Sequence, residues 1–178
     1  IPEPTIYDKS KKRINKILFP SRVFGVHYPY RSLWLKFVNA EPKRATKVRF
    51  LDKTSHLVGK SYNERLGKFR AVFVVVTHTG YLIRKLYETI MMGSLLLVAF
   101  PPNVNGNIAR KVWNNLGFIE GRHYLEATFE NFDGLTKKVL NGTYDALPQA
   151  AHKEGMENHI VPRNRLKSFL EACDSHLK

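Results

Sequence analysis

The longest apolar runs lie in the middle of the chain. Residues 70–78, RAVFVVVTH, and 94–100, SLLLVAF, are almost continuously apolar, and the first is rich in β-branched side chains. Such runs are typical of strands that are buried on both faces of a parallel sheet. We therefore expect Val72–Val76 and Leu95–Ala99 to be the central strands. Shorter apolar stretches predict three more strands, at Lys16–Phe19, KVRFLD (47–52) and HYLEA (123–127).

Between these runs, apolar residues recur at helical spacing. In YRSLWLKFVNA (30–40) they are Leu33, Trp34, Phe37 and Val38, which predicts an amphipathic helix. The other predicted helices are SYNERLGKF (61–69), about Tyr81–Met92, IARKVWNNLGF (108–118), ENFDGLTKKVLNG (130–142), DALPQAAHKEGMENHI (145–160) and PRNRLKSFLEACDSHL (162–177). PPNVNGN (101–107) is rich in turn-forming residues and is expected to be a loop.

Strands and helices alternate along the whole sequence. This order predicts an α/β fold: a single Rossmann-like domain with a mostly parallel sheet of about five or six strands flanked by helices. The length of 178 residues is enough for one domain with its own core. No apolar run reaches about 18 residues, so we expect no transmembrane segment.

Positive charge is concentrated in the first part of the chain. The net charge is +14, and residues 1–70 hold 17 lysines and arginines against 5 acidic residues. Such a segment attracts anions: nucleic acid, acidic lipid headgroups or phosphorylated small molecules. A basic solvated surface without a specific partner is the alternative.

The single cysteine, Cys173, excludes an internal disulfide and is compatible with a reducing compartment such as the cytoplasm. The start, IPEPTIYDKSKKR, lacks an initiator Met and the apolar centre of a signal peptide, which indicates a fragment or a processed product.

Ligands of open parallel sheets bind at the carboxyl ends of the strands. Three segments follow predicted strands and hold cations, aromatic rings or amides: PSRVFGVHYPYR (20–31), THTGY (77–81) with the helix after it, and PPNVNGN. These groups suit a phosphate-bearing aromatic ligand. The sequence lacks G-x-G-x-x-G, a Walker motif, a G-x-S-x-G elbow and D-x-D. These absences disfavour an ordinary dinucleotide, P-loop or hydrolase site and a tight metal site.

The segment YNERLGKFRAVFVVVTHTGYLIRKLYETIMMGSLLLV (62–98) resembles part of a known family. From Lys16 to the end, the chain is similar to the C-terminal, donor-binding half of GT-B-type glycosyltransferases, of the group 1-like or spore-coat type. The similar elements include Gly80, the K-x-x-E sequence from Lys85 to Glu88, and Gly93 before an apolar strand. LGFIEGRHYLEA (116–127) and GMENHIVPRNRLKSFL (155–170) also resemble family segments. The resemblance implies a basic lead-in over 1–15 and a Rossmann-like nucleotide-sugar-binding domain over 16–178.

The resemblance implies roles for particular residues. Glu88 occupies the position of the glutamate that binds the ribose hydroxyls, and Lys85 that of a basic residue facing the diphosphate. Arg22 is the candidate for further phosphate contacts, and Gly80 lets the backbone approach the ligand. The complete donor-binding set that we expect is Arg22, Arg31, Gly80, Tyr81, Arg84, Lys85 and Glu88. The family chemistry implies metal-independent transfer of the sugar, without a cofactor, to an unknown glycan, lipid or protein acceptor.

Two departures from the family pattern limit what the resemblance implies. Tyr81 stands where many retaining members have a second glutamate, so the stereochemical outcome does not follow. A GT-B enzyme has two Rossmann-like halves, and this chain is long enough for one, so a separate acceptor-binding domain is expected and the catalytic residues stay unassigned.

Two other hypotheses remain open at this stage. The chain could be a nucleic-acid-binding or ribonucleoprotein component on a transferase-like scaffold, which the basic residues 1–70 favour. It could also be a structural domain without a ligand. In that case Arg84 and Lys85 would form exposed helical ion pairs with Glu88, each contributing a few tenths of a kcal/mol.

Overall fold

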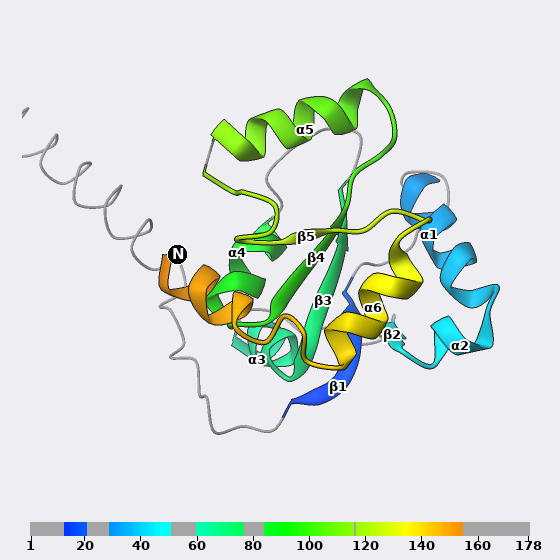
Figure 1. Ribbon diagram of the computed structural model, residues 1–178, viewed down its shortest axis with the longest axis horizontal. Coiled ribbons are helices and arrows are strands. Elements are labelled where there is room, and N and C mark those ends of the chain that lie inside the picture. Colours follow the sequence, from blue (N-terminus) through cyan, green and yellow to red (C-terminus); the bar gives the residue numbers. More distant parts are fainter. Residues whose placement is uncertain (1–12, 21–28, 51–59, 77–83, 116, 155–178) are drawn as a thin grey trace, which may run out of the picture.

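Five parallel strands form the centre of the molecule (Figure 1). The computed structural model describes residues 13–20, 29–50, 60–76, 84–115 and 117–154. The strands are β1 (Ile14–Phe19), β2 (Val48–Phe50), β3 (Phe69–Val75), β4 (Leu95–Ala99) and β5 (Leu125–Glu126), in the order β2-β1-β3-β4-β5. All four pairings are parallel. The predicted α/β fold class is confirmed, and the strand number agrees with the expectation of about five or six.

In the part of the chain that the structure describes, helices connect or follow the strands. They are α1 (Pro29–Asn39), α2 (Pro42–Ala45), α3 (Lys60–Gly67), α4 (Arg84–Met91), α5 (Val104–Asn115) and α6 (Phe132–Leu140), and residues 147–154 are also helical. The short helix α2 was not predicted. The last predicted helix, over 162–177, lies outside the described residues, as do residues 1–12 of the predicted lead-in over 1–15. The strand β1 already begins at Ile14, within that predicted lead-in.

The sheet separates two apolar layers. Side chains alternate along a strand, so Ala71, Phe73 and Val75 of β3 face one layer while Val72 and Val74 face the other. The first layer includes buried residues of α1 and α6, and the second includes buried residues of α3, α4 and α5. Figure 1 shows the helices on both sides of the sheet. Because both faces of β3 and β4 are covered, their sequences are apolar apart from Arg70 near the start of β3.

The strand order contains one change of direction. From β1 the chain adds β2 on one side, then crosses back through α3 to place β3 on the other side of β1, and continues outward to β4 and β5. This order is one of the two common orders of doubly wound sheets, and its switch point lies between β1 and β3. At that point Ile17 is paired with Ala71 and Leu18 with Val72.

Two ion pairs connect the basic first part of the chain to the acidic residues of the last part. Arg44 in α2 makes a bidentate contact with Asp133 in α6, at 2.9–3.0 Å. Arg70 of β3 contacts the Asp145 carboxylate at 2.6 Å. Some of the positive charge near the start of the sequence therefore stabilises the fold.

The prediction of a loop over PPNVNGN was wrong in its second half. The helix α5 begins at Val104, because the Asn103 side-chain oxygen accepts hydrogen bonds from the backbone N–H groups of Asn105 and Gly106, at 3.1 and 3.3 Å. An asparagine in this position caps a helix N-terminus. The turn-forming residues are therefore the first turn of a helix that starts close to the end of β4.

Candidate functional site

Arg31 occupies the switch point of the sheet. It lies in the first turn of α1 and is 9% exposed. Its Nε donates a hydrogen bond to the carbonyl oxygen of Val75, the last residue of β3, at 3.5 Å. Arg31 was one of the predicted donor-binding residues. The structure thus places a buried guanidinium where the first turn of α1 approaches the carboxyl end of β3.

The first turn of α1 favours an anion for a second reason. It contains no acidic residue, so its backbone N–H groups and the helix dipole present positive potential. Tyr30, beside Arg31, packs edge-to-face on Trp34 and Phe129, which fixes this turn against the aromatic layer below it. Burial raises the pKa of the Tyr30 phenol above its ordinary value of 10.0.

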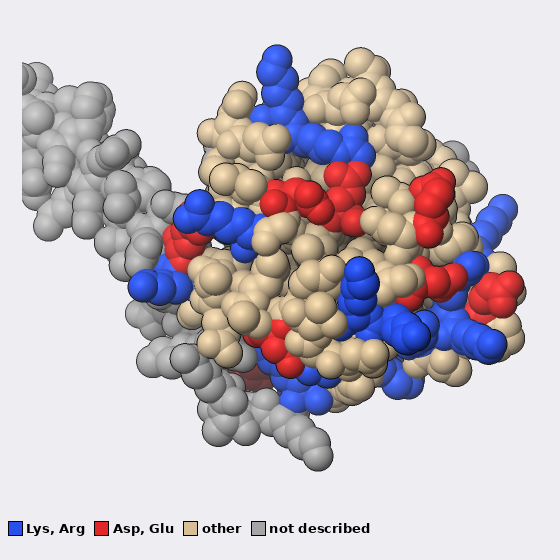
Figure 2. All heavy atoms as spheres, viewed as in Figure 1, with Lys and Arg blue, Asp and Glu red and all other residues tan. Residues whose placement is uncertain are grey.

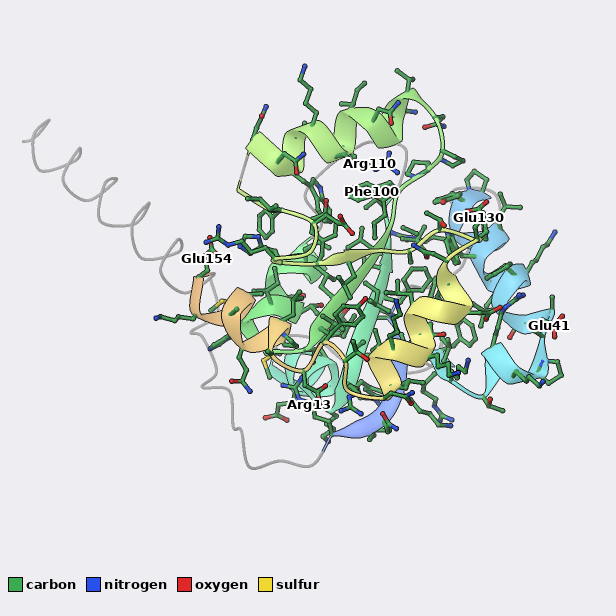
Figure 3. The ribbon with its side chains drawn as sticks, viewed as in Figure 1. Arg13, Glu41, Phe100, Arg110, Glu130 and Glu154 are labelled. Atoms are coloured by element: carbon green, nitrogen blue, oxygen red, sulfur yellow. The ribbon has the colours of Figure 1, made fainter. Side chains whose placement is uncertain are left out.

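A second charged group lies at the same edge of the sheet, at the ends of β4 and β5. Arg110 of α5 makes a bidentate ion pair with Glu126, and its guanidinium lies 4.9 Å from the ring centre of Phe100 (Figure 3). Arg110 also donates to the Asn107 side chain at 3.1 Å. The Glu126 hydrogen bonds raise the pKa of Arg110. We call these four residues the Arg110 cluster.

The Arg110 cluster and Tyr30 are electrostatically connected. Both Glu126 and Arg110 act on the Tyr30 phenol, with opposite effects on its pKa and less strongly than burial. Charges on β5 and α5 thus act on a phenol of α1. The sequence analysis did not find Arg110 or Glu126, because they are separated along the chain and belong to no short motif.

The N-terminus of α5 is less suited to a ligand than that of α1. Asn103 already accepts hydrogen bonds from the N–H groups of Asn105 and Gly106. Gly106 is buried against the preceding turn, and a Cβ atom at this position would lie 1.8 Å from the carbonyl oxygen of Pro101. The structural role of this glycine is therefore to bring α5 close to the end of β4.

Glu88 lies in the second turn of α4 and is partly buried. Its carboxylate is close enough to the Tyr62 phenol of α3 to add to the rise in the pKa of that phenol, which is caused mainly by burial. The helix α4 packs on the sheet face opposite to α1. Glu88 and Arg31 therefore belong to helices on opposite sides of the sheet.

The remaining predicted site residues are described only in part. Arg84 and Lys85 form the start of α4, but their side chains are not among those that the structure describes. Arg22, Gly80 and Tyr81 lie outside the described residues. The structure thus positions two of the seven predicted residues with their side chains, Arg31 and Glu88, and the roles of all seven stay predictions.

Charge on the surface is mixed. On the face in Figure 2, basic and acidic side chains of the described residues lie next to one another, and they form no continuous basic surface there.

Within the described ranges, no three carboxylate, imidazole or thiol side chains come together as ligands for a metal ion. The helices in the same ranges are too short or too polar to cross a lipid bilayer.

Comparisons with known proteins add no family. No model of a known protein family matches the chain, and no curated protein matches it. The resemblance to the glycosyltransferase half therefore depends on the sequence motifs themselves. What the structure establishes is a Rossmann-like α/β domain with five parallel strands and its switch point between β1 and β3.

Proposed function

We propose that this chain binds a nucleotide-diphosphate sugar at the carboxyl edge of its sheet and is the donor-binding domain of a glycosyltransferase. The observation that supports this most strongly is the burial of Arg31 in the first turn of α1, next to Val75. A buried guanidinium beside a helix N-terminus suits a phosphate group, because both present N–H donors and positive potential.

Glu88 and Lys85 would bind the other parts of the donor. Both belong to α4, on the other side of the switch point, and Glu88 is partly buried rather than fully exposed. A carboxylate accepts hydrogen bonds from two ribose hydroxyls well. Lys85, Arg22 and a helix N-terminus would stabilise the departing diphosphate electrostatically, without a metal ion. The acceptor, a glycan, lipid or protein, would be bound by another domain.

A panel of nucleotide diphosphates and their sugars, measured by thermal shift, tests this proposal. A ligand at a hundred times its dissociation constant adds about 2.7 kcal/mol to the free energy of unfolding. For a domain of this size this corresponds to a rise in Tm of roughly 5–10 °C. We expect Arg31→Met to remove the shift. Lys36→Met, at the exposed last turn of the same helix, is the matched control and should keep it.

Nucleic-acid binding is the second candidate function. The exposed cations Lys16, Lys36, Arg49 and Lys68 favour it. Against it, Arg44 and Arg70 make intramolecular ion pairs. Salt separates the two functions, because the affinity for a polyanion falls steeply as salt releases counterions, while a site for one nucleotide depends on salt much less. Absence of any nucleotide shift, together with steeply salt-dependent RNA or DNA binding, would favour the second function.

A further inference from the structure

Two lysines lie opposite each other near the starts of β1 and β2. Ile17 is paired with Val48, and its backbone N–H donates a hydrogen bond to the carbonyl oxygen of Lys47 at 2.9 Å. Lys16 and Lys47 directly precede this pair and are therefore neighbours on adjacent strands. Lys16 is exposed and Lys47 is half-buried. Because adjacent strands lie about 4.8 Å apart, two positive charges are placed side by side here.

The same arrangement recurs between β1 and β3. Ile14 is paired with Phe69, and its backbone N–H donates to the carbonyl oxygen of Lys68 at 2.8 Å. Arg13 and Lys68 directly precede this pair. Lys68 is exposed, and Arg13 is half-buried with its Nη2 3.4 Å from the carbonyl oxygen of Met92. Basic residues therefore lie at the starts of β2, β1 and β3, which are adjacent in the sheet.

The end of α6 adds further cations to this edge of the sheet. Arg70 donates to the Asn15 side chain at 3.0 Å and to the carbonyl oxygen of Leu140 at 2.8 Å, so the last turn of α6 lies beside the starts of β1 and β3. Lys137 and Lys138 of that turn are exposed. In Figure 1 the strand starts and the end of α6 lie together at the lower side of the view. We call this surface the basic edge, and its residues are Arg13, Lys16, Lys47, Lys68, Lys137 and Lys138.

The carboxylates near the basic edge do not neutralise it. Asp145 and Asp133 are already held by Arg70 and Arg44. In the part of the chain that the structure describes, none of the lysines of the basic edge lies within ion-pair distance of a carboxylate. Like charges that face each other on adjacent strands destabilise a sheet. A sequence that keeps such a local cost indicates side chains that act on something outside the domain.

A row of fixed cations fits a regular row of anions. The backbone of a nucleic acid carries one charge about every 3.4 Å along each strand, and lysines contact its phosphates without reading the bases. An anionic lipid surface is another extended anion, but segments that enter it place several apolar side chains beside the cations. In the described part of β1, β2 and β3, Ile14 is the exposed large apolar residue. The basic edge therefore favours a nucleic acid.

We propose that the basic edge binds the phosphate backbone of a nucleic acid. This surface lies at the starts of the strands, whereas the proposed nucleotide site lies at their carboxyl ends, on the opposite edge of the sheet. The inference therefore goes beyond the proposed function and does not depend on it. Contacts to phosphates carry no sequence information, so we expect binding without sequence preference.

Salt dependence of the affinity tests this proposal. The experiment uses the full-length chain and a fluorescein-labelled DNA duplex of random sequence, with Kd measured by anisotropy at several salt concentrations. Each phosphate contact contributes about 0.9 to the slope of log affinity against log salt, so Lys16→Gln combined with Lys68→Gln should reduce this slope by about 1.8. The matched control is Lys111→Gln combined with Lys153→Gln. It removes the same charge from exposed positions of α5 and of the helix over 147–154, and it should keep the parent slope.

Two results would overturn the proposal directly. The first is a parent chain that does not bind the duplex at low salt, and the second is an equal slope in the two double variants. Phosphatidylserine vesicles, measured by co-sedimentation, test the lipid alternative. Binding to vesicles that depends on Lys16 and Lys68, without binding to the duplex, would show that the basic edge contacts a lipid surface instead.

The thermal shift with nucleotide-diphosphate sugars separates this inference from the proposed function. We expect Lys16→Gln combined with Lys68→Gln to keep the shift of the parent. Duplex binding through the basic edge without any nucleotide shift in the parent would support this inference and count against the nucleotide site alone. Loss of the shift in the double variant only would show that both ligands use one surface, which contradicts the proposal.

Charge reversal at Lys16 gives a second measurement. Lys16→Glu turns a like-charge pair with Lys47 into an opposite-charge pair, so the Tm at low salt should rise while affinity for the duplex falls. Lys111→Glu makes the same change at an exposed position of α5 and should weaken duplex binding much less. A residue with a purely structural role would not give opposite effects on stability and binding. A lower Tm for Lys16→Glu, or the parent affinity for the duplex, would contradict the proposal.

Discussion

The side chain of Arg31 connects the first turn of α1 to the end of β3, because its Nε lies 3.5 Å from the carbonyl oxygen of Val75. This hydrogen bond crosses the position where the strand order changes direction. It holds a cation at the carboxyl edge of the sheet. The arginine therefore has a structural role in addition to the proposed contact with a phosphate.

Arg31→Lys separates the two roles. Lysine keeps the charge but lacks the planar guanidinium, so it cannot donate to Val75 and a phosphate in the same fixed geometry. The hydrogen bond is long, and we expect its loss to lower the free energy of unfolding by about 1 kcal/mol. We expect affinity for a nucleotide diphosphate to fall more than affinity for the nucleoside. Equal losses for both ligands, measured by calorimetry, would indicate a purely structural role.

Arg70 of β3 makes side-chain hydrogen bonds to three residues that are distant in the sequence. Its guanidinium donates to the Asp145 carboxylate at 2.6 and 3.2 Å, to the Asn15 side chain at 3.0 Å and to the carbonyl oxygen of Leu140 at 2.8 Å. Arg70→Lys removes this fork geometry and should lower the free energy of unfolding by about 1–2 kcal/mol in urea titrations. Arg49→Lys, exposed on the edge strand β2, is the control and should have little effect. Equal stability of the two variants would show that the Arg70 contacts do not stabilise the fold.

Asp133 makes the stability of the domain depend on acid pH. Hydrogen bonds from Arg44 lower its pKa below the ordinary value of 3.8. A carboxylate whose pKa is lower in the folded state stabilises that state above its unfolded pKa, and this stabilisation is lost as pH falls through the folded pKa. We expect Asp133→Asn to have a lower Tm than the parent at pH 7. The difference should disappear as the pH falls below about 4.

The control for this pH experiment is Glu120→Gln, at an exposed position after α5. Its Tm should follow that of the parent across the same pH range. A difference between Asp133→Asn and the parent that stays constant down to low pH would exclude ionisation of Asp133 as the cause.

The features that the sequence predicts well are those determined by local composition. The apolar runs of β3 and β4 predict central strands because both of their faces are covered. Gly142 was predicted to close α6, and its positive φ of 90° explains why a glycine is suited to the residue after the cap. Arg31 was selected because ligand-binding residues follow strands in this class of fold, and its binding role stays a prediction.

The features that the sequence did not predict depend on contacts between distant residues. Arg110 and Glu126 pair across α5 and β5, and no periodic pattern marks such a pair. The start of α5 was missed because Asn, Gly and Pro are common in both turns and first helical turns. Only the capping geometry of Asn103 distinguishes the two. The segments that hold Arg22 and Gly80 lie outside the described residues, so those predictions stay untested.

The close approach of α5 to β4 should be sensitive to one methyl group. Gly106→Ala would place Cβ 1.8 Å from the carbonyl oxygen of Pro101, a contact that only a backbone shift can relieve. We expect a loss of about 3 kcal/mol in the free energy of unfolding. Gly134→Ala is the matched control, because Gly134 is exposed in α6 and its Cβ would have nothing within 4 Å. This second variant should gain about 0.5–1 kcal/mol. Equal stabilities in urea titrations would show that α5 can move away from Pro101 at little cost.

The α4 residues give the most direct test of the nucleotide site. Glu88→Gln keeps the shape of the side chain but loses the negative charge that strengthens hydrogen bonds from ribose hydroxyls. We expect it to weaken nucleotide binding by roughly 1.5–3 kcal/mol, about a ten- to hundredfold rise in Kd. Glu64→Gln, at an exposed position of α3, is the control and should bind as the parent does.

Lys85→Ala should weaken the binding of a nucleotide diphosphate far more than the binding of the corresponding nucleoside, because only the diphosphate carries charge. If calorimetry gives the parent Kd for every nucleotide in both α4 variants, these residues do not bind the ligand, and the donor-binding role of this helix is wrong.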